Sequence, residues 1–235
     1  FVDMAQARER GITVTNTPGY ADQAVAEHTL ALTLGVMKQL GTDRDIRSGN
    51  WGAEHASREF GATTIGIVGM GGIGRRFAEL ASALGFSVLC WNRSYENRPE
   101  LPRGVTAVAL EELLDRSDIV SLHLGLNDET SGFFDAAMFQ KVRSGSAFIN
   151  TARAELVDRD AFLGALDSGR IVAAGLDVFH TEPRPADDPL LSRPNVIVTP
   201  HIGSFTIGAT RRVLEIAVGN LEAFFAGTPT NVVST

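Results

Sequence analysis

The sequence predicts an α/β fold in which helices cover both faces of a doubly wound parallel sheet. From about residue 63 onwards, short apolar runs of strand length alternate with helical patterns of apolar residues, as in βαβ units. A glycine-rich turn joins the first of these runs directly to a helix. The composition, with 44% hydrophobic and 21% charged residues in a chain of 235, is typical of a folded globular protein.

The segment before the alternating pattern contains its own turn signals. It predicts, in order, a helix over 3–10 that ends at Gly11, a strand over 12–15, a turn over 16–19, a helix from Asp22 to Leu40, and a further helix with its connection over 43–60. The helix from Asp22 to Leu40 is apolar around much of its circumference, which packing on one domain face rarely requires. We therefore expect a second buried surface there, such as a subunit interface.

Strands and helices then alternate along the rest of the chain. The expected strands are 64–68, a run that ends at Trp91, 118–122, 146–149, 171–177 and 195–199. The expected helices are one that opens on the glycine-rich turn and those over 110–116, 135–142, 158–168 and 206–225. The Pro-rich stretch 181–189 is predicted to be a loop.

The glycine-rich turn, GMGGIG over 69–74, lies between a predicted strand and a predicted helix. In such a turn Gly69 permits the tight bend, Gly71 lets the backbone approach a pyrophosphate, and Gly74 lets helix and strand pack closely. The pyrophosphate accepts hydrogen bonds from amides at the positive end of the helix dipole. The turn therefore predicts a Rossmann-type dinucleotide-binding domain, with a glycine-rich turn that binds no ligand as the alternative.

The end of the second predicted strand bears on the choice of cofactor. NAD-binding units usually place an acidic residue here to accept hydrogen bonds from the ribose hydroxyls, whereas this chain has Asn92, Arg93 and Ser94. A guanidinium can pair with a 2′-phosphate, and a serine can add a hydrogen bond. The sequence therefore favours NADP. NAD is the alternative if Arg93 only stacks on the adenine or is solvated.

Charge and composition disfavour several classes of partner. The formal net charge is −7, and nucleic-acid binding draws on clustered Lys and Arg instead. No segment reaches the roughly 20 apolar residues of a membrane span, and no secretory signal is visible. The single cysteine, Cys90, excludes an intrachain disulfide and fits the reducing cytoplasm. No cluster of His, Cys, Asp and Glu has metal-ligand spacing.

Arg153, Glu182 and His201 each follow a different predicted strand. Because ligands of open α/β sheets bind beyond the carboxyl ends of the strands, these residues are expected at the crevice that holds the nicotinamide. An arginine can bind a carboxylate and polarise a carbonyl, a histidine can give a proton to the new alkoxide, and a carboxylate can keep that histidine protonated. Together they predict hydride transfer to a 2-keto acid. Taken singly, each is more often a surface or structural group.

Six ordered motifs show a resemblance that extends over nearly the whole chain. They are NTPGY…VAEHTLAL, GIVGMGGIG, DIVSLH, NTAR, GLDVF-x-TEP and TPHIGS. With them, the chain resembles the D-isomer-specific 2-hydroxyacid dehydrogenases, which are oxidoreductases acting on CH–OH groups. The resemblance implies that Arg153 binds the substrate, that His201 is the acid/base and that Glu182 is its partner.

The resemblance also extends the candidate cofactor site. It implies that Asp177 lies beside the nicotinamide carboxamide and that Thr151 and Ala152 line the cofactor. His123 ends a predicted strand and is expected in a cofactor loop, with a structural histidine as the alternative. The full candidate set is Val25, Gly69, Met70, Gly71, Gly72, Ile73, Gly74, Asn92, Arg93, Ser94, His123, Leu124, Gly125, Thr130, Thr151, Ala152, Asp177 and Gly203.

The chain opens at Phe1 without an initiator Met, as though cut from a longer protein. Members of the family begin with a flavodoxin-like substrate domain, most of which is expected to be absent. The expected division is a remnant of that domain over 1–20, a dinucleotide-binding domain over 21–203 with a dimerisation arm over 21–60, and a helix over 204–235 that returns to the substrate domain.

Three residues depart from the family pattern without removing a catalytic group. Ala154 replaces a usual Gly, Gly125 replaces a usual Pro, and Phe205 replaces a small residue and is expected to bring bulk near the site. The leading hypothesis is a cytoplasmic homodimer that reduces glyoxylate, hydroxypyruvate or a related 2-keto acid with NADPH. The alternatives are a dinucleotide-sensing corepressor-like binding protein and a cofactor-binding fragment that is inactive for lack of its substrate domain.

Overall fold

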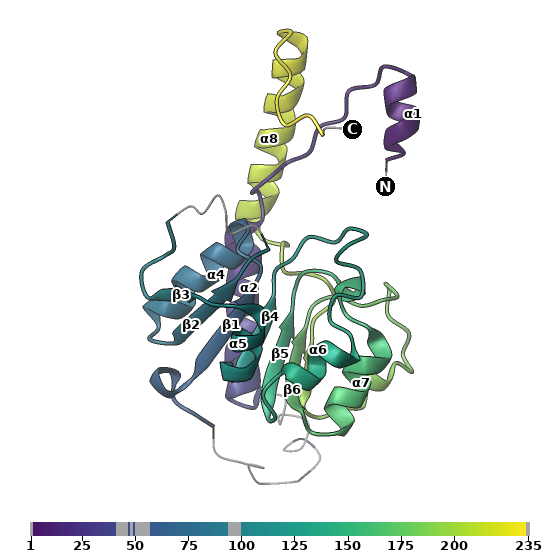
Figure 1. The fold of residues 1–235 in the computed structure, drawn as a ribbon. Helices are drawn as coiled ribbons and strands as arrows, with labels where there is room; N and C mark the ends of the chain where they lie inside the picture. The colour runs from purple at the N-terminus through teal and green to yellow at the C-terminus, as the bar shows by residue number, and fades with distance from the viewer. Residues whose placement is uncertain (1, 41–46, 48, 50–56, 94–99, 234–235) are drawn as a thin grey trace.

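The computed structural model describes residues 2–40, 47, 49, 57–93 and 100–233, and within them a seven-stranded parallel sheet lies between two layers of helices (Figure 1). The strand order is β3-β2-β1-β4-β5-β6-β7. The strands are β1 (Thr64–Val68), β2 (Ser87–Trp91), β3 (Val105–Ala107), β4 (Ile119–Leu122), β5 (Ser146–Asn150), β6 (Ile171–Leu176) and β7 (Val196–Val198). The order reverses between β1 and β4, so the predicted doubly wound parallel sheet is confirmed.

Two helices, α2 (Asp22–Met37) and α4 (Gly72–Ala83), cover one face of the sheet and pack against each other. Their buried residues form one core with side chains from alternate strand positions, such as Ile65 and Ile67 of β1. Side chains of a strand point alternately to the two faces. Because the central strands are buried on both faces, they appear in the sequence as continuous apolar runs.

Three helices cover the opposite face, namely α5 (Leu110–Arg116), α6 (Ala136–Lys141) and α7 (Arg159–Asp167). At the centre of this second core, the ring of Phe148 in β5 lies 5.3, 5.4 and 5.4 Å from the rings of Phe134, Phe139 and Phe162. Phe148 is fully buried, and burying such a side chain contributes about 1.5–3 kcal/mol. This core fixes β5 and the start of the loop that follows it.

The carboxyl ends of the strands lie along one edge of the sheet. Gly69 follows β1 and His123 follows β4, at the point where the strand order reverses. The two loops are hydrogen-bonded to neighbouring strands, since Gly69 N donates to Trp91 O and His123 N donates to Val68 O, both at 2.8 Å. A crevice between such loops is the usual ligand site of an open α/β sheet.

Helix α8 (Ile207–Phe225) and the N-terminal segment with α1 (Met4–Glu9) project from the sheet on the same side (Figure 1). An isolated antiparallel bridge between Thr15 and Val232 joins the two ends of the chain. A row of apolar side chains on α8 is exposed: Ile207, Leu214, Val218, Leu221 and Phe225. The two terminal segments therefore form a unit that stands apart from the sheet and its two cores.

Most predicted elements are present, with small differences at their ends, but one predicted strand is absent and one observed strand was not predicted; the helix expected over 43–60 lies largely outside the described residues. The strand over 12–15 is wrong, because the described chain makes only the isolated bridge at Thr15 and runs outside the sheet. The edge strand β3 was missed, because its three residues are too few to show a period. Helix α2 ends at Met37 rather than at Leu40.

The apolar circumference of α2 is explained within the chain. The helix packs on the sheet and on α4, and along its length only Glu27 and Ala31 are exposed. Its apolar surface therefore does not require a subunit interface, contrary to our sequence argument. The expected arm over 21–60 includes residues 41–46, 48 and 50–56, which lie outside the described residues. Among the described residues, no helix combines the length and the apolar character that a membrane span needs.

Candidate active site

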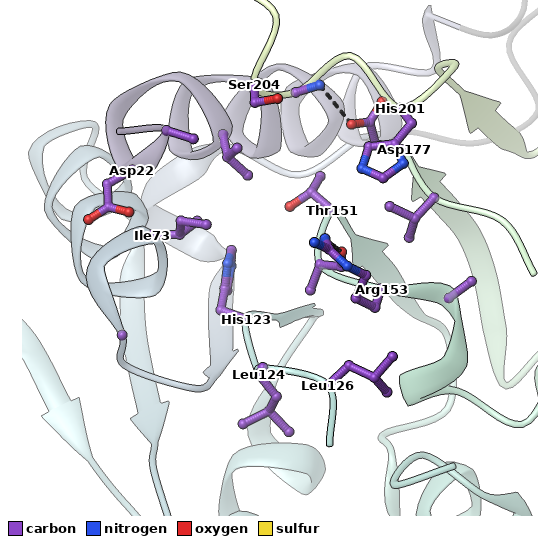
Figure 2. Close-up of a pocket in the computed structure, with 18 of the residues that line it drawn as sticks. Asp22, Ile73, His123, Leu124, Leu126, Thr151, Arg153, Asp177, His201 and Ser204 are labelled. Carbon is purple, nitrogen blue, oxygen red and sulfur yellow. Dashed lines mark hydrogen bonds between the residues drawn. The ribbon is translucent and has the colours of Figure 1, made fainter. Parts of the chain in front are cut away.

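A cavity of about 900 Å³ lies at the carboxyl edge of the sheet, where the loops after β1, β4, β5, β6 and β7 meet. In Figure 2, Asp22 and Ile73 lie on one side of the open space, Arg153 and His201 lie on the other, and His123 lies between them. The cavity therefore connects the glycine-rich turn with the polar residues that follow the last three strands.

The glycine-rich turn has the shape that a bound diphosphate needs. Gly69 has a φ of +104°, which L side chains rarely adopt, and a Cβ at Gly74 would lie 2.0 Å from the carbonyl oxygen of Gly69. A Cβ at Gly71 would meet nothing within 4 Å, so the space beside this residue is open. Gly72 and Ile73 begin α4 and line the cavity, so the positive end of the helix dipole faces it. These residues fit a dinucleotide.

Asn92 and Arg93 follow β2 beside the glycine-rich turn. The carboxamide oxygen of Asn92 accepts a hydrogen bond from Met70 N at 3.4 Å, and the Arg93 guanidinium forms an ion pair with Glu129. Ser94 lies outside the described residues. NAD-binding units usually carry a carboxylate at this position. Here the residue is Asn92, whose neutral side chain contacts the turn, and the neighbouring cation, Arg93, is already paired with Glu129.

His123 lines the cavity as a neutral imidazole. Its Nε2 lies 2.9 Å from Ser121 Oγ, and its ring centre lies 5.4 Å from that of Phe77. Burial lowers the pKa of His123 to about 3, because desolvation disfavours the charged imidazolium. His123 is therefore uncharged at neutral pH.

The loop after His123 is held by its own hydrogen bonds. Thr130 Oγ1 donates to Gly125 O at 2.7 Å and accepts from Asn127 N at 2.8 Å. Thr130 is buried and is not among the residues that line the cavity, whereas Leu124 and Gly125 do line it. Thr130 therefore shapes the loop from behind, and only the first part of the loop faces the cavity.

Asp177, which follows β6, is a buried carboxylate at the centre of a hydrogen-bond network. Its Oδ1 accepts from Thr199 Oγ1 at 2.6 Å and from Ile202 N at 3.0 Å, and its Oδ2 accepts from Gly203 N at 2.8 Å. His28 of α2 completes the network, with its Nε2 2.9 Å from Thr199 Oγ1 and 3.3 Å from Asp177 Oδ1. Burial alone raises the pKa of Asp177, but these hydrogen bonds outweigh burial and hold it below its usual value.

Arg153 presents an exposed guanidinium at the cavity from the loop after β5. The buried side chain of Asn150 shapes this loop, because its Nδ2 donates to Arg153 O at 2.9 Å and its Oδ1 accepts from Ala152 N at 3.0 Å. Arg153 Nη1 donates to Ala152 O at 2.6 Å. No carboxylate in the described part of the chain pairs with this guanidinium, so it can receive an anion from the cavity.

Glu182 and His201 form an ion pair at the same end of the cavity. Glu182 Oε2 lies 2.7 Å from His201 Nδ1, and Glu182 Oε1 accepts from Phe179 N at 2.9 Å. Burial raises the pKa of Glu182, but the bonds from His201 and Phe179 outweigh this and lower it below its usual value. His201 has a φ of +54°, a left-handed conformation that is uncommon outside functional sites and turns. The His201 side chain is 41% exposed, so substrate can reach it.

Comparison with known proteins identifies the family of the chain. Residues 30–203 match the family described as D-isomer specific 2-hydroxyacid dehydrogenase, NAD binding domain. The chain belongs to this family. As a 2-hydroxyacid dehydrogenase it is an oxidoreductase that transfers a hydride between a nicotinamide dinucleotide and a 2-hydroxy acid or 2-keto acid.

Individual relatives cover the whole chain. A hydroxypyruvate reductase from Blautia hydrogenotrophica is 36% identical over 241 residues, which span 99% of this chain and 74% of that protein. The structure of D-lactate dehydrogenase with NAD+ from Lactobacillus jensenii has a TM-score of 0.89 at 32% identity, over 100% of this chain and 75% of that one. The acyclic imino acid reductase Bsp5 in complex with NADPH and D-Arg has a TM-score of 0.88 at 32% identity, over the same shares.

Most predicted site residues of this dehydrogenase meet at the cavity. Those that line it are Val25, Gly71, Gly72, Ile73, His123, Leu124, Gly125, Thr151, Ala152, Arg153, Asp177, Glu182, His201 and Gly203. Those that do not line it are Gly69, Met70, Gly74, Asn92, Arg93 and Thr130. Phe205 does not bring bulk to the cavity, because its side chain is 83% exposed and turned to solvent.

Two site residues of α2 were missed by the sequence analysis. Asp22 lines the cavity and lies against the start of α4, since a Cβ at Gly72 would lie 1.9 Å from Asp22 Oδ2. His28 contacts Asp177, far away in the sequence. The apolar pattern of α2 indicates packing only, and the motif VAEHTLAL was the one signal that included His28. Within the described ranges, no group of three or more His, Cys, Asp and Glu could hold a metal ion.

Proposed function

We propose that this dehydrogenase reduces a small 2-keto acid, with glyoxylate and hydroxypyruvate as the first candidates, and that it prefers NADPH. The observation that carries the proposal is the placement of two groups in one cavity. One is the Arg153 guanidinium, and the other is the pair of His201 Nδ1 and Glu182 Oε2 at 2.7 Å. Together they offer the anion receptor and the proton that carbonyl reduction requires.

Arg153 binds and orients the substrate in this proposal. Its planar guanidinium can hold a carboxylate with two parallel hydrogen bonds, and a further N–H can polarise the adjacent carbonyl oxygen. The loop is already held in place by Asn150 through Arg153 O and Ala152 N. Little reorganisation is then needed when charge develops on the carbonyl oxygen.

His201 donates the proton to the carbonyl oxygen from Nε2, because its Nδ1 is engaged by Glu182. A bound reduced nicotinamide supplies the hydride that the carbonyl carbon receives. The ionised Glu182 stabilises the protonated imidazole and fixes the orientation of its ring. In the oxidation direction, the neutral imidazole accepts the proton of the substrate hydroxyl at the same atom.

The cofactor would extend from the glycine-rich turn to the part of the cavity that holds Arg153 and His201. The first amides of α4, near Gly72 and Ile73, would receive its diphosphate. The buried carboxylate of Asp177 lines the same cavity and would lie beside the nicotinamide carboxamide, from which it could accept a hydrogen bond. Thr151, whose Oγ1 lies 2.8 Å from Thr29 Oγ1, and the neutral His123 form fixed walls beside it.

The preference for NADPH rests on the residues after β2. Asn92 carries no charge that would repel a 2′-phosphate, and Arg93 can pair with one. Similar proteins are seen with NAD+ and with NADPH. Fluorescence titration compares the two affinities directly. We expect NADPH to bind about tenfold more tightly or better, and equal affinities or a preference for NADH would contradict the proposal.

The terminal segments are proposed to belong to a separate substrate domain. Residues 1–20 and 204–235 contact each other through the Thr15–Val232 bridge, and the exposed apolar row on α8 offers a surface for such a domain to cover. Residues 21–60 are proposed to include the arm of a homodimer. A cytoplasmic location is consistent with a single, buried cysteine, Cys90, which has no second cysteine in the chain for a disulfide.

Turnover tests the proposed reaction. The protein is incubated with NADPH and either glyoxylate or hydroxypyruvate, and the loss of NADPH absorbance is followed. Oxidation that depends on the acid supports the proposal. Tight NADPH binding without oxidation in the presence of either acid would contradict it and favour one of the two alternatives, a dinucleotide-sensing binding protein or a cofactor-binding fragment that is inactive for lack of its substrate domain. Restoring the substrate domain and repeating the assay distinguishes these two.

A further inference from the structure

The Arg93 guanidinium, the cation that our proposed function offers to a 2′-phosphate, already has a carboxylate partner. It forms an ion pair with Glu129, and both side chains are largely exposed, at 59% and 72%. Glu129 belongs to the loop after β4, whereas Arg93 follows β2. The pair therefore connects two loops that border the glycine-rich turn.

The position of Glu129 is fixed by its loop. The side-chain oxygen of Asn127 accepts hydrogen bonds from Glu129 N and from Thr130 N, both at 3.0 Å. Thr130 is buried and anchors the loop through its bond to Gly125 O. The carboxylate is thus presented from a locally ordered turn of the Asx type, rather than from a freely moving chain.

The two loops are also held together beneath the ion pair. Trp91, the last residue of β2, stacks on Phe133 with ring centres 5.8 Å apart. Phe133 lies in the same loop as Glu129. This contact holds the loop against the end of β2, which places Glu129 within reach of Arg93.

We propose that Glu129 limits the preference for NADPH by acting as the resident counter-ion of Arg93, an inference that rests on the proposed function. A 2′-phosphate must displace the Glu129 carboxylate from the guanidinium, and it is also repelled by this like charge. The 2′-hydroxyl of NADH carries no charge and does not enter this competition. Glu129 therefore acts on the ratio of the two affinities, while Arg93 supplies the attraction.

The expected effect is moderate, because an exposed ion pair is weak and is screened by salt. Replacing Glu129 by Gln removes the competing charge and keeps the size of the side chain. We expect the dissociation constant of NADPH to fall by about three- to tenfold, and that of NADH to change by less than about twofold. The effect on NADPH should shrink as ionic strength rises.

The experiment titrates both cofactors by fluorescence into the parent protein and into four variants. They are Glu129→Gln, the matched control Asp128→Asn, Arg93→Ala, and the double variant Arg93→Ala/Glu129→Gln. Asp128 is an exposed neighbouring carboxylate, so its removal makes the same change in net charge without freeing Arg93. We expect tighter NADPH binding in Glu129→Gln alone, and no such gain when Arg93 is absent.

Three results would overturn the inference: an unchanged ratio of affinities in Glu129→Gln, an equal gain in Asp128→Asn, or a gain that persists without Arg93. These readouts measure binding and do not depend on turnover. A protein that binds both cofactors but reduces neither acid would contradict the proposed reaction alone. A protein that binds neither cofactor would overturn both the proposed function and this inference.

Discussion

The two ends of the cavity are built from different parts of the chain. At the cofactor end the backbone sets the shape, because Gly74 packs so closely on Gly69 that a Cβ would lie 2.0 Å from its carbonyl oxygen. At the catalytic end, Arg153, Glu182 and His201 are exposed side chains from three separate loops. The shape of the cofactor end is determined by one short stretch of sequence. The arrangement of side chains at the catalytic end depends on the order of the strands in the whole sheet.

The histidines of these two regions show the same difference. His123, after β4, is half-buried and lies near Phe77, and desolvation lowers its pKa to about 3. His201, after β7, is 41% exposed and is paired with the Glu182 carboxylate at 2.7 Å. Both line one cavity. A position in the cavity therefore does not by itself indicate a catalytic role. What distinguishes His201, the proposed acid/base, from His123 is its carboxylate partner and its greater access to solvent.

Removing the imidazole of His201 should produce the largest effect on catalysis. We expect His201→Ala to lower turnover by about a hundredfold or more, because general acid catalysis supplies rate factors of that size. NADPH binding should change little, since His201 lies away from the glycine-rich turn. His180→Asn is the matched control, because His180 lines the same cavity but has Val157 O as its partner. Near-normal turnover of His201→Ala would contradict our account.

Removing the guanidinium of Arg153 should come next in size. We expect Arg153→Ala to lower kcat/KM by about ten- to a hundredfold, with a higher KM and a lower kcat, because the guanidinium acts on both bound substrate and transition state. Arg153→Lys should recover only part of this loss, since an ammonium cannot form the two parallel bonds. Steady-state kinetics with a fixed saturating cofactor separate the two constants. A change confined to KM would assign Arg153 to binding alone.

Two glycine substitutions should distinguish a glycine that the fold needs, Gly74, from a glycine that the cofactor needs, Gly71. Gly71→Ala adds a methyl group in open space at a φ of −70°, so we expect an unchanged melting temperature and about tenfold weaker NADPH binding or worse. Gly74→Ala forces a Cβ onto the Gly69 carbonyl, so we expect the melting temperature to fall by roughly 4–10 °C. Thermal unfolding and cofactor titration of both variants test this. Equal behaviour of the two variants would contradict the distinction.

The smallest expected effect is a displacement of the pH profile. The pKa of Glu182 lies below its usual value, so this side chain is ionised at neutral and alkaline pH and favours the protonated imidazole. In Glu182→Gln that stabilisation is lost, and the proton donor is deprotonated at lower pH. We expect the alkaline limb of the reduction rate to move to lower pH, by a modest amount because the exposed pair is partly screened by solvent. An unmoved limb would show that Glu182 has no electrostatic effect on the acid.

The cofactor end could be predicted from the sequence because its information is local. The turn over 69–74, the strand before it and the helix after it are contiguous, and each has an unmistakable pattern. The positions of Arg153, Glu182 and His201 at strand ends could also be predicted, because parallel strands place their carboxyl ends along one edge. Their distances could not be predicted, since these depend on how three loops pack.

The residues that escaped the sequence analysis act across long separations. His28 reaches Asp177 because α2 packs over β6. Glu129 reaches Arg93 because the loop after β4 packs against the end of β2 through Phe133 and Trp91. Neither contact produces a periodic pattern of residues that could be recognised in the sequence. The apolar circumference of α2 correctly indicated a second buried surface, but that surface is α4 of the same chain, and the sequence pattern could not distinguish it from a subunit interface. The strand expected over 12–15 lacked a neighbour in the sheet.

The central claim is that His201, and not His123, supplies the proton. The most direct test is the pH dependence of the reduction rate in the parent protein, in His123→Asn and in His201→Asn. We predict that His123→Asn keeps the alkaline limb of the profile, because a histidine with a pKa of about 3 does not titrate there, and that His201→Asn loses the limb along with most of its rate. Loss of the limb in His123→Asn with its retention in His201→Asn would contradict the account.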